Sequence, residues 1–162
     1  MDKIRILIAD DHEIVRKWIR KILEKQIDMD VVDEAADGRE AVEKILKHHP
    51  DIVLTDIVMP EMNGLEVVRQ IRKSGMKTLF IILSIHKNDA YVYEAFMTGA
   101  SGYLVKPCLS LNIVKAIRSV FSGDIFLSPR INSEFIRCFL RNRMQNSNAG
   151  LSSPLSCHHQ NQ

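Results

Sequence analysis

Five short apolar runs alternate with five amphipathic stretches along the first 125 residues of the chain. The runs are rich in Ile, Leu and Val, are bounded by turn-forming residues, and cover residues 3–9, 29–35, 52–54, 79–83 and 102–105. Such runs are typical of strands that are buried on both faces. Between them, apolar residues recur at helical spacing, which predicts helices at about residues 12–26, 41–46, 64–73, 92–96 and 111–121. This alternation predicts a parallel sheet with helices on both faces.

The character of the chain changes after Gly123. Ser128 is a candidate helix-capping residue, and Pro129 would be a proline in the first turn. The apolar stripe that follows predicts an amphipathic helix over residues 129–143. Residues 144–162 are polar, rich in Asn, Ser and Gln, and lack periodicity, which predicts disorder. The predicted organisation is a domain at residues 1–125, a linker and helix at residues 126–143, and a disordered tail at residues 144–162.

Composition and charge narrow the class of protein. The 162 residues are 46% hydrophobic, which is enough for one domain with a sizeable core and an appendage. Residues 1–125 hold 18 Lys and Arg against 19 Asp and Glu, a net charge of −1, whereas residues 126–162 hold 4 against 1, a net charge of +3. A weakly acidic body with a short basic end lacks the clustered basic face of a nucleic-acid-binding domain.

The cysteines and the apolar runs bear on the location of the protein. Three cysteines form no CxxC pair and leave one thiol unpaired in any bridge scheme, which favours a reduced protein. No apolar run approaches the length of a membrane span, and Asp10 and Asp11 interrupt the first run too early for a signal peptide. We therefore expect a soluble, cytoplasmic protein.

Reactive side chains stand where four of the predicted strands end. Asp10 and Asp11 follow the first run, Asp56 follows the third, and Ser84 and Lys106 follow the fourth and fifth. The carboxyl ends of the strands in an open α/β sheet form the edge at which ligands bind. Carboxylates this close would repel one another unless a cation neutralised them, and a hard ion such as Mg²⁺ takes oxygen ligands. Acids, a hydroxyl and a lysine together suit a phosphoryl group beside a metal.

The motifs around these positions resemble the receiver domain of two-component response regulators over roughly residues 3–122. They are Asp10-Asp11, Asp56, Ser84 and Lys106-Pro107, together with the segments Met59-Pro60-Glu61-Met62-Asn63-Gly64 and Gly99-Ala-Ser-Gly-Tyr-Leu-Val-Lys-Pro107. The resemblance implies a flavodoxin-like (βα)5 fold, a doubly wound parallel sheet in the order 2-1-3-4-5, with a C-terminal helix added.

The resemblance also implies a role for each site residue. Asp56 would accept a phosphoryl group from a sensor histidine kinase, and Lys106 and Ser84 would contact the phosphoryl oxygens. The Mg²⁺ would be held by Asp11 and Asp56 directly, by Asp10 through water, and by the backbone carbonyl of Val58. Tyr103 would be the aromatic switch that turns inward when Ser84 moves. These roles describe a signalling phosphoacceptor that catalyses only its own phosphorylation and dephosphorylation, not an enzyme for other substrates.

Within the family, the chain resembles the NarL/FixJ (LuxR-type) regulators, whose second domain is a DNA-binding helix-turn-helix. That domain would start near Gly150, and the dozen residues that follow are too few for it, so we expect a truncated or stand-alone receiver without direct DNA binding. Homodimer formation through the first and last helices, or through the face around Tyr103, is left open.

Other interpretations remain at this point. A phosphatase of the haloacid-dehalogenase type would carry a second acid where this chain has Val58. A degenerate receiver would act only as a docking module. Asp56, or one of Asp10 and Asp11, could be only a helix cap, and Ser84 and Tyr103 could be ordinary residues at strand ends. The branched side chain of Ile85 leads us to expect slow self-dephosphorylation, because it would hinder water approaching an acyl phosphate.

Overall fold

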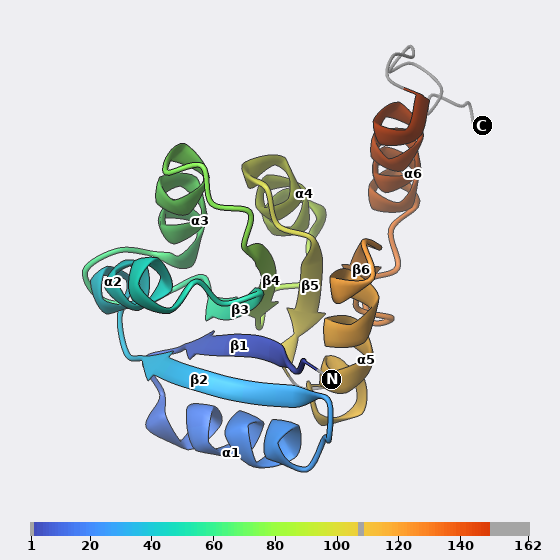
Figure 1. Ribbon diagram of the computed structural model, residues 1–162. Coiled ribbons are helices and arrows are strands. Elements are labelled where there is room, and N and C mark those ends of the chain that lie inside the picture. The colour runs from blue at the N-terminus through green and yellow to red at the C-terminus, as the bar shows by residue number, and fades with distance from the viewer. Residues whose placement is uncertain (1, 107–108, 150–162) are drawn as a thin grey trace, which may run out of the picture.

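The computed structural model describes residues 2–106 and 109–149. Its centre is a sheet of parallel strands in the order β2-β1-β3-β4-β5-β6 (Figure 1). The strands are β1 (Ile4–Ala9), β2 (Met29–Ala35), β3 (Ile52–Asp56), β4 (Leu79–Ser84), β5 (Gly102–Val105) and β6 (Phe126–Leu127). The flavodoxin-like class and the order 2-1-3-4-5 of the five predicted strands are confirmed.

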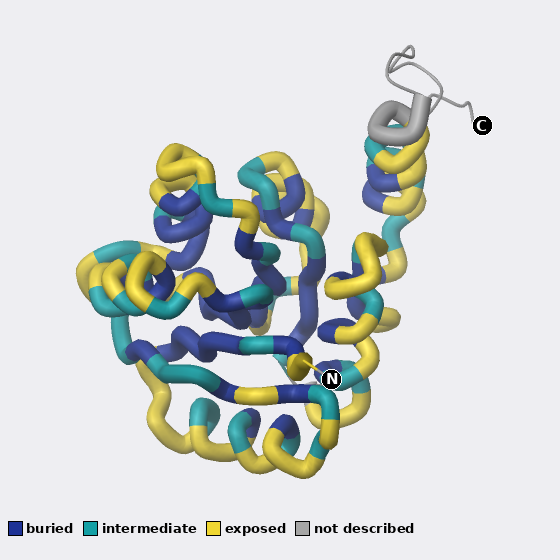
Figure 2. The backbone as a smooth tube through the Cα atoms, viewed as in Figure 1, coloured by how far each residue is buried: buried dark blue, intermediate teal, exposed yellow. Residues whose placement is uncertain are grey.

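Helices cover both faces of the sheet. One buried cluster joins the sheet to α1 (Glu13–Glu24) and α5 (Leu109–Phe121). A second cluster joins the opposite face to α2 (Gly38–His48), α3 (Gly64–Lys73) and α4 (Asp89–Thr98). The central strands are dark blue almost throughout in Figure 2, whereas the helices alternate between buried and exposed positions. This is the pattern that continuous apolar strands and striped helices predict.

Side-chain caps fix where the helices after β3 and β4 begin. The carboxamide oxygen of Asn63 accepts from the Glu66 N–H at 2.9 Å, and that of Asn88 accepts from the Tyr91 N–H at 3.4 Å. Each cap satisfies a backbone N–H that has no partner inside its helix and stabilises the structure by about 1 kcal/mol. The caps therefore set the lengths of the two loops that lead out of the carboxyl edge of the sheet.

The segment after Gly123 differs from its prediction. The Phe126 N–H donates to the Ser101 carbonyl at 3.0 Å and the Ser128 N–H to the Tyr103 carbonyl at 2.9 Å, which adds β6 to the sheet edge. A strand of two residues is too short to produce a detectable sequence period.

The last helix, α6 (Glu134–Ala149), begins five residues later than predicted. Its cap is Ser133, whose hydroxyl accepts from the Ile136 N–H at 3.1 Å, and not Ser128. Residues 144–149, expected in a disordered tail, belong to this helix. Residues 150–162 lie outside the described residues.

Helix α6 packs against α4. The ring of Tyr93 on α4 lies 4.8 Å from that of Phe139 and 5.8 Å from that of Phe135, measured between centroids. The guanidinium of Arg143 donates to the carbonyl of Phe96, and Ile136 is fully buried. The apolar stripe of the C-terminal helix therefore finds its partner on the α/β body of the same chain.

Two expectations about location can be compared with the structure. The prediction of reduced cysteines is wrong for Cys138, which is disulfide-bonded, because an odd number of thiols still permits one bridge. Cys108 and Cys157 lie outside the described residues. Within residues 2–106 and 109–149, no helix is both long enough and apolar enough to cross a membrane.

Candidate functional site

Asp56 is the last residue of β3, and its carboxylate stands at the carboxyl edge of the sheet. All five residues of this strand are buried, and Asp56 is 7% exposed. The loop that follows returns closely to the strand, because the Gly64 N–H donates to the Ile57 carbonyl at 2.7 Å. A Cβ atom on Gly64 would lie 2.0 Å from the Asp56 carbonyl oxygen. Only glycine permits this approach, which holds the start of α3 against the end of β3.

Lys106 follows β5 directly and joins two of the acids. Its ammonium lies 2.9 Å from Oδ2 of Asp56 and 3.0 Å from Oδ2 of Asp10. Burial lowers the pKa of Lys106, but its hydrogen bonds to the two carboxylates outweigh burial, so the pKa is raised. Burial also raises the pKa of Asp56, and Lys106 offsets only part of that rise. The ammonium therefore stays charged beside a carboxylate that has lost most of its water.

Asp10 and Asp11 follow β1 and reach the same edge. Asp10 is fully buried, and its Oδ1 accepts from the His12 N–H at 2.9 Å. Its Oδ2 forms an ion pair with the Lys106 ammonium. Asp11 is more exposed, with 32% of its side chain accessible. Neither acid caps α1, whose N-cap is His12, a residue without a side-chain cap bond.

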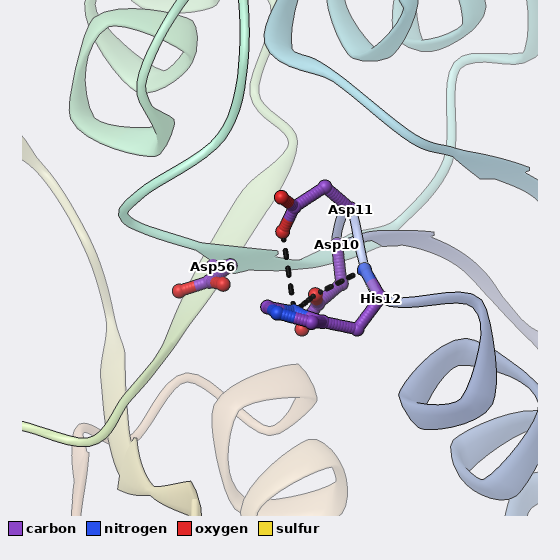
Figure 3. Close-up of side chains that lie close together, drawn as sticks. All are labelled: Asp10, Asp11, His12 and Asp56. Atoms are coloured by element: carbon purple, nitrogen blue, oxygen red, sulfur yellow. Dashed lines mark hydrogen bonds and ion pairs between the residues drawn. The ribbon is translucent and has the colours of Figure 1, made fainter.

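His12 belongs to the site, although the sequence analysis did not assign it there. Its Nδ1 lies 2.8 Å from Oδ1 of Asp10 and 3.2 Å from Oδ1 of Asp11 (Figure 3). The hydrogen bond to Asp10, followed by the charges of both acids, raises the pKa of His12. The available signal was three consecutive residues with metal-ligating side chains at a strand end.

Ser84 and Tyr103 meet at one loop residue. Ser84 ends β4 and is 2% exposed, and its hydroxyl accepts from the His86 N–H at 3.0 Å. Tyr103 in β5 is fully buried, and its hydroxyl donates to the His86 carbonyl at 2.8 Å. The His86 ring stacks on Tyr91 in the first turn of α4, with 4.1 Å between centroids. The Ser84 hydroxyl is thus linked through one loop to the helix that carries α6.

A pocket of about 340 Å³ opens beside these side chains. Its lining includes Asp11, His12, Asp56, Ile57, Val58, Ser84, Ile85, His86 and Lys106. The side chains of Val58 and Ile85 are largely exposed at its edge. Every polar residue of this lining except His12 and His86 was predicted from the sequence to belong to the site.

The donor set fits a hard divalent cation. One oxygen of each of Asp10, Asp11 and Asp56 and one nitrogen of His12 lie within 4.8 Å of one another. Carboxylates this close repel one another, and the Lys106 ammonium balances the charge of only one of them, so a further cation would be favourable here. The acidic pocket is compatible with Mg²⁺, which prefers carboxylate oxygens and retains several of its waters.

Comparison with known families shows which family the chain belongs to. The sequence profile of the response regulator receiver domain matches residues 6–118. The chain belongs to the response regulator receiver family. Response regulators are signalling proteins, and the matched residues include Asp10, Asp11, Asp56, Ser84 and Lys106.

Relatives of this receiver domain include named regulators. The oxygen regulatory protein NreC of Staphylococcus carnosus is 35% identical over 147 residues, which cover 90% of this chain and 68% of NreC. The transcriptional regulatory protein DegU of Brevibacillus brevis is 35% identical over 140 residues, which cover 86% of this chain and 59% of DegU.

A solved structure agrees with this family. The crystal structure of a LuxR-family two-component response regulator from Aurantimonas sp. SI85-9A1 superposes with a TM-score of 0.76 at 36% identity. The superposition covers 80% of this chain and 93% of that chain. The predicted LuxR-type subfamily of the receiver domain is confirmed by these relatives.

Proposed function

We propose that this receiver domain accepts a phosphoryl group on Asp56 from a sensor histidine kinase and thereby switches the surface formed by α4 and β5. The observation that carries the proposal is the position of the Lys106 ammonium, 2.9 Å from Asp56 and 3.0 Å from Asp10 at the end of the sheet. A charged ammonium held beside Asp56 can contact the oxygens of a phosphoryl group attached to that carboxylate.

The transfer needs a nucleophilic carboxylate and balanced charge. An oxygen of Asp56 forms a bond to phosphorus while the N–P bond of the phosphohistidine breaks and its electron pair returns to the imidazole. Lys106 keeps its proton and contacts the incoming phosphoryl oxygens. A Mg²⁺ ion held by Asp10, Asp11, Asp56 and the Val58 carbonyl would offset the negative charge that gathers on those oxygens.

Ser84 converts the new group into a change of shape. In the structure its hydroxyl accepts from the His86 N–H, and its own proton could turn to donate to a phosphoryl oxygen on Asp56. Drawing Ser84 toward Asp56 weakens its hydrogen bond to His86. The carbonyl of His86 also accepts from the Tyr103 hydroxyl, and the His86 ring stacks on Tyr91. A local electrostatic event would thus bias this loop. Tyr103 is already buried in this structure, so it would take part through its hydrogen bond to the His86 carbonyl and not by turning inward as the resemblance implied.

The altered surface is the output of the domain. Helix α4 directly follows the loop that contains His86, and its Tyr93 packs on Phe139 of α6. A shift of this loop therefore reaches both helices. Relatives named as transcriptional regulators support a role in the regulation of transcription, through a second copy of the chain or another protein partner.

Phosphorylation with a small phosphodonor tests the proposal. The chain is incubated with acetyl phosphate and Mg²⁺, and its intact mass is followed with time. We expect one added phosphoryl group on the native chain and on Asp124→Asn, and none on Asp56→Asn. Asp124 is an exposed acid just after the turn that follows α5, so this variant matches the chemical change without touching the site.

Other outcomes have distinct meanings. Continuous release of phosphate at a rate that exceeds adduct decay would favour the haloacid-dehalogenase type of enzyme. A native chain that stays unmodified in the presence of bound Mg²⁺ would refute the proposal and favour a docking module.

A further inference from the structure

A groove lies between the edge strand β6 and helix α6. Its volume is about 330 Å³, which is at the small end of the range of ligand sites. The apolar part of its lining includes five side chains: Ile125, Leu127, Ile131, Leu140 and Met144. In Figure 1 the chain leads from β6 to α6 on the side of the molecule opposite α2. The groove shares no lining residue with the pocket that contains Asp56, so it is a separate feature.

Ser128 lines the same groove and carries a polar atom without a partner. The residue is 1% exposed, and its hydroxyl makes no hydrogen bond to any described residue. Buried polar atoms are nearly always hydrogen-bonded, because leaving one unpaired lowers the stability of the fold. This hydroxyl would gain its hydrogen bond when an oxygen of a ligand enters the groove.

Two guanidiniums line the α6 side of the groove. Arg137 and Arg141 are four residues apart, so they lie on one face of the helix. Arg137 donates to the carboxamide oxygen of Asn132 at 3.1 Å, which uses only one of its N–H groups. Within the described part of the chain, neither arginine pairs with an acid and no acid lines the groove. The groove therefore offers positive charge beside an apolar wall.

We propose that this groove binds a small carboxylate that carries an aliphatic or aromatic body. A guanidinium pairs with a carboxylate through two parallel hydrogen bonds, and the Ser128 hydroxyl provides a further donor in the groove. The apolar body would lie on Leu140 and Met144. A singly charged carboxylate fits better than a phosphate dianion, because the lining is largely apolar and burial of charge is costly.

A ligand in this groove would hold α6 on the α/β body. The Ser128 N–H donates to the Tyr103 carbonyl of β5 at 2.9 Å, and Leu140 belongs to the buried cluster that joins α6 to α4. The ligand would therefore contact both the sheet edge and the last helix. Binding does not depend on phosphorylation of Asp56, so its test is independent of the function proposed above.

Octanoate is a suitable probe, because it joins a carboxylate to a flexible apolar chain. Octanamide is its neutral counterpart, and acetate has the charge without the body. Each is titrated at neutral pH into the isotope-labelled chain, and binding is followed by the chemical shifts of the backbone amides. We expect saturable shifts for octanoate, concentrated in the residues that line the groove, and at least about fivefold weaker binding of octanamide, because the charged hydrogen bonds are lost.

Two variants assign the binding to named side chains. Arg141→Gln should weaken octanoate binding by about threefold to fivefold, the range of an exposed ion pair. Its control is Arg39→Gln, the same change at an exposed arginine of α2 outside the groove, which should bind octanoate as the native chain does.

Ser128→Ala should have two effects of opposite sign. It removes an unpaired buried hydroxyl, so the urea midpoint of the unliganded chain should stay the same or rise. It also removes a donor for the ligand, so octanoate should bind about fivefold more weakly. A lower urea midpoint would show that the hydroxyl has a structural partner and would contradict the inference.

Equal affinity of the native chain for octanoate and octanamide, or shifts that do not saturate, would overturn the inference. This comparison uses only the native chain, so it decides even if Ser128→Ala does not fold. Equal octanoate affinity of the native chain and Arg141→Gln would likewise contradict recognition of the carboxylate by α6.

Discussion

Gly64 offers the sharpest test of how the fold positions Asp56. A Cβ atom at this position would lie 2.0 Å from the Asp56 carbonyl oxygen and 3.0 Å from the Thr55 hydroxyl. Ordinary contact begins at about 3.4 Å, so Gly64→Ala forces a separation of more than about 1 Å between the start of α3 and the end of β3. Overpacking of this kind costs about 1–3 kcal/mol of unfolding free energy.

The same displacement should impair the chemistry. A shift of about 1 Å in a reacting group can lower a rate by a factor of about 10². We therefore expect Gly64→Ala to reduce the initial rate of phosphorylation by acetyl phosphate at least about tenfold. Stability is measured by urea denaturation followed by circular dichroism, and the rate by intact mass.

Gly75→Ala is the control for loss of stability alone. Gly75 has a φ of +87°, where a side chain is strained, but no atom lies within 4 Å of its Cβ position. It should lose about 1 kcal/mol or more through backbone strain and keep the native phosphorylation rate. If Gly64→Ala reacts as fast as Gly75→Ala, the close approach of α3 does not position Asp56.

Three further substitutions test the pH dependence of stability, the response of α4 to phosphorylation and the hydrolysis of the acyl phosphate. Burial raises the pKa of Asp56, so the folded state holds this proton more tightly and loses stability as pH rises from the unfolded pKa toward the folded one. Asp56→Asn should therefore raise the urea midpoint at neutral pH, and this gain should vanish below about pH 3, where the carboxyl is largely protonated in both states; a gain that persists in acid would contradict the sign. Ser84→Ala should slow phosphorylation by no more than about tenfold, the worth of one hydrogen bond, but abolish the phosphorylation-dependent change in amide exchange of α4. A preserved exchange change would remove Ser84 from the switch. Ile85→Ala should accelerate release of phosphate from the acyl phosphate, with Ile27→Ala, an exposed and distant residue, as control; equal decay would refute the shielding role of Ile85.

The sequence predicted the elements whose signal is a long apolar period. All five residues of β3 are buried, and the first three are hydrophobic. The strand and its terminal acid, Asp56, could therefore be predicted from one segment. The sixth strand could not, because two residues define no period and their pairing depends on backbone contacts with β5. The start of α6 was misplaced because two serines could cap it, and only the fold selects Ser133.

Some residues of the site could likewise be predicted from the sequence, and others could not. Acids, hydroxyl and lysine at strand ends converge because parallel strands end at one edge, which is a consequence of topology. His12 and His86 were not assigned to the site because their roles depend on the directions of a ring and of a backbone group. His12 reaches Asp10 from the start of a helix, and His86 binds Ser84 and Tyr103 through its main chain.

Chemical location of the phosphoryl group tests the central claim most directly. Borohydride reduces an aspartyl phosphate to homoserine, and peptide mass mapping of the acetyl-phosphate-treated chain then identifies the modified residue. The account predicts homoserine at position 56 and at no other aspartate. Homoserine at position 10 or 11, or a fully unmodified chain, would contradict it.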